Sequence, residues 1–158
     1  MATVIYDADC GFCRWCLAVL LSWDHAGGSG SGGTHGRPSP PNLQVRWGRS
    51  AVFGALRPLP LDTEEADRLL ADLTPEQRAA SWHLVDDEGR RTSAGAALAP
   101  AFSLLPGGRY PATVFAHFPG ATERGYRRVA EHRGLLGRFV PGRARRWADR
   151  IIVRSTYP

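Results

Sequence analysis

Apolar and polar positions near the start of the chain predict a buried strand followed directly by an amphipathic helix. Residues 3–6 are β-branched or aromatic, which is typical of a short buried strand. From residue 10 to about residue 23, apolar side chains recur at the three- and four-residue spacing of a helix. Residues 7–9 form the turn between these elements, where Asp9 is a candidate N-cap.

A break in composition follows this helix. Residues 26–41 are dominated by glycine, serine and proline, a composition that cannot bury enough apolar surface to order itself. We therefore predict a flexible loop inside one domain, because each flank is too small to fold alone. Residues 43–47 then alternate apolar and polar side chains, which predicts a half-buried strand.

The remaining pattern predicts short helices around one β-hairpin. A helix opens at Asp62 or Thr63 and runs to about residue 73, and Thr74 starts a second helix with a capping box. Two short strand-like segments flank an acidic turn and predict a hairpin over residues 82–92. Helical patterns then cover residues 94–105, 111–118, 122–132 and 143–153.

Together these elements predict a single α/β domain, a small sandwich with a βαβ N-terminal half, a β-hairpin and a helical C-terminal part. The length of 158 residues suits one domain. The longest apolar run, residues 17–21, is far too short to span a bilayer, and the N-terminus lacks the basic and apolar regions of a secretory signal. We therefore expect a soluble, cytoplasmic protein without a transmembrane segment.

Positive charge is concentrated at the C-terminal end. The net charge is +5, every basic residue is an arginine, and half of the 20 arginines lie within residues 124–154. Only Glu131 and Asp149 oppose them there. We treat residues 134–158 as a basic helical extension of a domain at residues 1–133, and its arginines as a candidate surface for an acidic partner.

The cysteines are clustered in one short segment of the predicted helix. They are Cys10, Cys13 and Cys16, and the chain contains no other. An odd number of neighbouring thiols excludes a structural disulfide framework. In a reducing compartment, such a cluster indicates redox chemistry or a metal site.

Two of these cysteines form a C-x-x-C where the strand passes into the helix. The first turn of a helix has unpaired N–H groups and a partial positive charge, which make a thiol easier to ionise. The thiolate is the nucleophile in disulfide exchange, so Cys10 is the candidate attacking sulfur. Cys13 lies one turn further along and is the candidate resolving thiol, because residues three apart share a helix face.

Asp7 precedes the motif at the end of the predicted strand. Burial there should raise the pKa of its carboxyl group and make it a proton acceptor for Cys13. Its charge also opposes ionisation of Cys10, so the net effect on the thiol is not determined by the sequence. The alternative is that Asp7 and Asp9 are only turn and capping residues.

Residues 7–13, DADCGFC in one-letter code, match the D-x-x-C-x-x-C motif of the DCC family of predicted thiol-disulfide oxidoreductases. Residues 82–98 look like the middle hairpin and following helix of that family, and residues 126–133 look like its closing helix. The resemblance covers most of residues 3–133. It implies a thioredoxin-like fold and disulfide exchange at the two cysteines of the motif.

The chain departs from that family in its glycine-rich loop, which is longer than expected, and in residues 134–158, which look like an addition. It also has no proline just before the strand at Trp82. Typical thioredoxin-like proteins place a cis-proline there, against the active cysteines.

Three other interpretations remain open. Cys16 extends the motif to C-x-x-C-x-x-C, which could hold an iron–sulfur cluster or zinc, and a fourth zinc ligand would come from Asp7, His25 or His35. Asp7 and Asp9 also resemble the D-x-D of haloacid dehalogenase-type phosphatases, with residues 86–87 as the metal-binding acidic pair. The third is a non-enzymatic binding module that uses the basic C-terminal helix.

The residues and the resemblance lead us to expect a thiol-disulfide oxidoreductase that works in the reductase direction. Cys10 attacks, Cys13 resolves and Asp7 assists proton transfer. No motif implies a cofactor. The expected substrate is a protein or small-molecule thiol or disulfide, and the sequence does not identify the electron donor.

Overall fold

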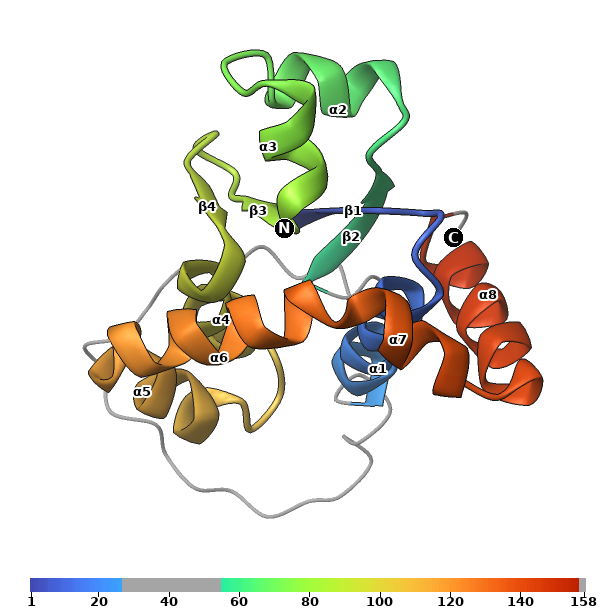
Figure 1. Cartoon of the computed structure of the whole chain (residues 1–158). Helices are drawn as coiled ribbons and strands as arrows, with labels where there is room; N and C mark the ends of the chain where they lie inside the picture. The colour runs from blue at the N-terminus through green and yellow to red at the C-terminus, as the bar shows by residue number, and fades with distance from the viewer. Residues whose placement is uncertain (27–54, 157–158) are drawn as a thin grey trace.

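A computed structural model describes residues 1–26 and 55–156 of the chain (Figure 1). Apart from Ala26, which ends the first helix, the predicted loop at residues 26–41 lies outside the described residues, as does the predicted strand at residues 43–47. Within the described part, no helix is both long enough and apolar enough to cross a membrane.

Four strands form one mixed sheet in the order β2-β1-β3-β4. β1 pairs in parallel with β2 and antiparallel with β3, and β3 pairs antiparallel with β4. The strands are β1 Ala2–Tyr6, β2 Leu56–Pro60, β3 His83–Val85 and β4 Arg91–Ser93. The βαβ half and the hairpin are therefore confirmed, although the second strand of the βαβ unit is one that the sequence pattern did not predict.

β2 contains two prolines. They are tolerated because β2 pairs with a neighbouring strand on one side only within the described sheet. Ala2 N–H donates to Ala55 O, and Leu61 N–H donates to Tyr6 O, so the odd-numbered positions of this segment face β1. Strand alternation then directs the nitrogens of Pro58 and Pro60 away from β1, where no ladder hydrogen bond is lost.

The second and third helices begin directly after threonine residues that cap them. α1 (Gly11–Ala26) follows β1, α2 is Glu64–Leu69 and α3 is Pro75–Ala80. Thr63 accepts a hydrogen bond from the Ala66 N–H. Thr74 forms the predicted capping box with Gln77, so both predicted helix starts are confirmed.

The C-terminal part is helical, as predicted, but is divided differently. The predicted helix at residues 94–105 is a 3-10 turn, η1, followed by a short helix, and an additional helix lies between the last two predicted ones. The elements are η1 Ala94–Ala97, α4 Leu98–Ser103, α5 Arg109–His117, α6 Pro119–Glu131, α7 Arg133–Phe139 and α8 Gly142–Thr156.

Helices cover both faces of the sheet, which confirms the α/β sandwich. Val4 and Tyr6 of β1 face a large apolar cluster that includes side chains of α1, α4 and α8. Ile5 points to the opposite face and packs in a smaller cluster with Ala66 and Leu70, in and just after α2. The alternation along β1 therefore places one strand between two apolar layers.

α8 contributes directly to the larger cluster. It packs along α1, as Figure 1 shows, and buries Ala148 and Ile152, which are 1% and 7% exposed. Residues predicted as an extension thus share their apolar contacts with β1 and α1.

We expect Ile152→Ala to lower the free energy of unfolding by about 2–4 kcal/mol, because it removes buried methyl and methylene groups and leaves a cavity. Chemical denaturation would measure this loss. Val153→Ala is the matched control on the same helix, since Val153 is exposed, and it should change stability by less than about 0.5 kcal/mol. Equal effects of the two substitutions would show that the α8 contact with the core is not stabilising.

His83, the first residue of β3, is almost completely buried, with 1% of its surface exposed. Its Nδ1 lies 2.7 Å from Ser93 Oγ, and its Nε2 lies 3.1 Å from Arg78 O. In the neutral ring, Nε2–H donates to the carbonyl and Nδ1 accepts from the hydroxyl. Burial lowers the pKa of His83 below its usual value of 6.5.

Protonation of His83 should therefore destabilise the fold. Above pH 6.5 both the folded and unfolded forms are neutral, and as the pH falls below 6.5 the unfolded chain binds a proton that the folded chain resists. We expect the free energy of unfolding to decrease between pH 6.5 and 5, as measured by urea denaturation. His83→Gln should flatten this slope, and an unchanged slope in that variant would contradict the assignment.

Candidate functional site

The turn between β1 and α1 is closed by the carboxylate of Asp7. Its Oδ1 accepts hydrogen bonds from the Asp9 N–H at 2.9 Å and from the Cys10 N–H at 3.2 Å. Asp9 itself is exposed. The prediction of Asp9 as the N-cap is therefore wrong: α1 starts at Gly11, so Cys10 occupies the cap position.

Cys10 caps α1 with its sulfur atom. The Cys13 N–H donates to Cys10 Sγ at 3.2 Å, and the Arg14 N–H donates to Cys10 O at 3.0 Å. The helix behind this sulfur is 16 residues long, so its N-terminus carries the full partial positive charge of a helix end. In the dithiol form, the same N–H group and the helix charge would stabilise a Cys10 thiolate.

Cys10 and Cys13 are joined by a disulfide, with their Cα atoms 5.2 Å apart. Both residues are half-buried at the surface end of α1. Asp7 is thus hydrogen-bonded to Cys10, and Cys10 is bonded to Cys13, within the segment that joins β1 to the first turn of α1.

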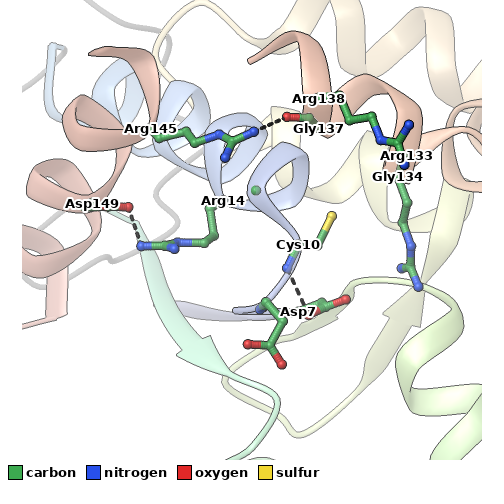
Figure 2. Close-up of a pocket in the computed structure, with 11 residues that line it drawn as sticks. Asp7, Cys10, Arg14, Arg133, Gly134, Gly137, Arg138, Arg145 and Asp149 are labelled. Carbon is green, nitrogen blue, oxygen red and sulfur yellow. Dashed lines mark hydrogen bonds and ion pairs between the residues drawn. The ribbon is translucent and has the colours of Figure 1, made fainter. Parts of the chain in front are cut away.

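Cys10 opens onto a cavity of about 500 Å³ that we call the arginine cavity. Side chains from the start of α1, from α7 and from α8 form its walls, and Cys10 Sγ points into it (Figure 2). Its lining residues are Asp7, Asp9, Cys10, Gly11, Arg14, Arg133, Gly134, Gly137, Arg138, Arg145 and Asp149.

Three of the four arginines of this cavity are held by other groups. Arg14 forms an ion pair with Asp149 of α8. Arg145 donates to Gly137 O at 2.5 Å, and Arg133 donates to Ala79 O at 3.0 Å. Arg138 is exposed and forms no ion pair with any described residue. Backbone carbonyls orient guanidinium groups without neutralising them, so the cavity keeps positive charge beside Cys10.

Cys13 and Cys16 line a second cavity, also of about 500 Å³, which we call the apolar cavity. It lies between β1, α1 and α6, and its walls are largely aromatic and aliphatic, including Phe12, Trp82 and Tyr126. Asp7 and Arg133 line both cavities. The two sulfurs of the C-x-x-C therefore face different surroundings, charged at Cys10 and apolar at Cys13.

The strand position that precedes β3 also differs from a thioredoxin-like site. Ser81 precedes Trp82, and no peptide bond among the described residues is cis. The Trp82 N–H donates to the hydroxyl of Tyr126 at 3.1 Å. The hydroxyl of a side chain of α6 thus accepts the hydrogen bond of a backbone N–H group next to the apolar cavity.

The two alternative chemistries receive no support from the geometry. Within residues 1–26 and 55–156, no group of three or more His, Cys, Asp or Glu side chains is placed to hold a metal ion. The side chain of the candidate ligand His25 and the whole of His35 lie outside the described part of the chain. The acidic pair at residues 86–87 follows β3, whose end pairs with Thr3, at the opposite end of β1 from Asp7. The phosphatase arrangement, which needs both acidic groups in one site, is therefore not formed.

Sequence analysis missed the arginines of the cavity as site residues. The excess of arginine in residues 124–154 was visible, but α7 was not predicted, so nothing placed Arg133 or Arg138 beside the cysteines. The spacing of Arg145 and Asp149 by four residues was the available signal, because it sets both on one face of α8.

Comparison of the chain with protein families, with curated proteins and with solved structures gave no match.

Cys16 is a free, half-buried thiol on the apolar side of α1. Burial raises its pKa from 9.0 to about 11. With the Cys10–Cys13 disulfide intact, we expect iodoacetamide to alkylate Cys16 about 100-fold more slowly at pH 8 than it alkylates an unperturbed thiol, because about 100-fold less thiolate is present. Mass spectrometry after timed labelling would measure this rate.

The control is the same protein unfolded in urea without reductant, in which Cys16 should react at the ordinary rate. Equal rates in the folded and unfolded proteins would contradict the buried position of this thiol.

Proposed function

We propose that this protein is a thiol-disulfide oxidoreductase of the DCC type, in which Cys10 attacks and Cys13 resolves. The observation that carries the proposal is the sulfur of Cys10, which caps α1, is bonded to Cys13 and opens onto a cavity large enough for a small ligand. The strand order, with a parallel βαβ unit beside an antiparallel hairpin, is compatible with the thioredoxin-like fold that the DCC resemblance implies.

In the reductase direction, the reaction starts from the dithiol form. The Cys10 thiolate attacks one sulfur of the substrate disulfide, a mixed disulfide forms on Cys10, and the other half of the substrate leaves as a thiolate that takes up a proton. Cys13 then loses its proton and attacks the Cys10 sulfur. The Cys10–Cys13 disulfide forms, the second half of the substrate leaves as a thiol, and two electrons have passed to the substrate.

In this proposal Asp7 assists the second step. It is half-buried and lines the same apolar cavity as Cys13. Its Oδ1 is engaged with the turn, while Oδ2 has no hydrogen-bond partner among the described residues. In this proposal Oδ2 accepts the proton of Cys13 during resolution.

Disulfide exchange needs only thiols and a proton acceptor, so the proposed reaction requires no organic cofactor. The substrate is a thiol or disulfide, and a second dithiol has to return the oxidised protein to its reduced state. The direction of net flow then depends on the potential of the Cys10–Cys13 pair against that donor.

A redox titration would test the proposal. We expect the Cys10–Cys13 disulfide to interconvert with the dithiol in glutathione buffers at potentials of about −270 to −120 mV, the range of related oxidoreductases. Acid trapping, alkylation and mass mapping would locate the disulfide. Cys13→Ser should leave a long-lived mixed disulfide on Cys10, because the resolving thiol is missing.

Cys16→Ser is the matched control, since Cys16 lies on the same helix but outside the disulfide. It should leave the titration unchanged. Thiols that stay reduced throughout the series, or a disulfide that uses Cys16, would overturn the proposal. Binding to anionic lipid or nucleic acid that persists unchanged in Cys10→Ser would instead favour the basic binding module.

A further inference from the structure

The arginine cavity surrounds the sulfur of Cys10 with charged side chains. Disulfide exchange itself does not require them. We propose that the protein acts on a small disulfide whose carboxylate groups lie a few bonds from the sulfurs, and that the arginines beside Cys10 bind those carboxylates. This inference rests on the proposed function and adds the class of substrate.

Arginines from three separate helices converge on the cavity that contains Cys10. Arg14 comes from α1, Arg133 and Arg138 come from α7, and Arg145 comes from α8. In Figure 2 the Cys10 sulfur points into the space between the side chains of α8 and those of α7. A group bonded to that sulfur would therefore lie among the guanidinium groups.

The carboxylates of the cavity leave some of these arginines without a counter-ion. Four arginines and three aspartates line the cavity, which leaves one positive charge in excess. Asp149 pairs with Arg14, Asp7 uses Oδ1 to hold the turn, and Asp9 is exposed. Among the described residues, Arg133 and Arg145 have only carbonyl partners, and Arg138 has no ion-pair partner. A ligand carboxylate would supply the missing charge, and a guanidinium can bind it through two parallel N–H···O bonds.

The size of the cavity also suits a small ligand. The cavity volume of about 500 Å³ falls in the range of small-molecule sites. Arg145 is tied to Gly137 O and Arg133 to Ala79 O, so their positions are set before a ligand arrives. Preformed positions of this kind suit a short, charged disulfide better than a variable protein surface.

The proposed reaction consumes one molecule of such a disulfide for each reduced protein. Cys10 forms a mixed disulfide with one half while the other half leaves as a carboxylate-bearing thiol. Cys13 then displaces the bound half, and the Cys10–Cys13 disulfide forms. Two protons and two electrons pass from the protein dithiol to the two product thiols, and no further reactant is needed for a single turnover.

Three short disulfides that differ mainly in charge would test this inference. The probes are 3,3′-dithiodipropionate, which is anionic, 2-hydroxyethyl disulfide, which is neutral, and cystamine, which is cationic. Pre-reduced full-length protein would be mixed with an excess of each, and formation of the Cys10–Cys13 disulfide would be followed by quenching and mass analysis. Each rate would be divided by the rate of the same probe with dithiothreitol, which removes its intrinsic reactivity.

We expect the normalised rate to be highest for the anionic probe and lowest for the cationic one. Arg138→Gln and Arg145→Gln should each lower the rate for the anionic probe by about fivefold, and 0.5 M salt should weaken the preference. Arg143→Gln is the matched control, because it removes the same charge from α8 outside the cavity, and it should change none of the rates.

Equal normalised rates for the three probes, or equal effects of the Arg138, Arg145 and Arg143 substitutions, would overturn the inference and leave the proposed function intact. Reduction of a disulfide in an acidic peptide without reduction of dithiodipropionate would assign the arginines to a protein substrate and would also overturn it. Failure to reduce any disulfide would instead refute the proposed function.

Discussion

The hydrogen bonds from Asp7 Oδ1 to the Asp9 and Cys10 N–H groups hold the connection between β1 and α1. β1 is fixed by the sheet on both sides, and α1 is fixed by its packing against α8, so the turn between them has little freedom. With the turn closed in this way, Cys10 falls directly before the helix and not within it. Its sulfur can then accept the Cys13 N–H, and the second cysteine follows one turn later.

The C-terminal helices complete the surroundings of this sulfur. α8 packs its apolar face on α1, and the same contact brings Asp149 to Arg14 and Arg145 to the end of α7. The helix that stabilises the core is thus also a wall of the arginine cavity. Cys13, bonded to Cys10, lines the neighbouring apolar cavity, so the disulfide lies where a charged cavity and an apolar cavity meet.

Local signals allowed much of the fold and the position of the C-x-x-C at the strand-to-helix turn to be predicted. The Cys10 and Cys13 positions, the strand before them and the capping box at Thr74 all depend on neighbours in sequence, and all are observed. Features that depend on distant contacts were missed. β2 carries prolines that normally argue against a strand, and α7 contains Gly134 and Gly137, which lower helix propensity. Asp9 was preferred as a cap on residue type, while the sulfur of Cys10 took that place.

The prolines of β2 also determine how the sheet ends. Its outward-facing nitrogens belong to Leu56, Pro58 and Pro60, and the single N–H among them donates to Asp24 Oδ2 at 3.0 Å. Among the described residues, this border of the sheet has carbonyl groups that could accept hydrogen bonds from a neighbouring chain. It has no free N–H group that could donate one. A foreign strand could not form a regular ladder against it, so this border of the sheet disfavours self-association by β-augmentation.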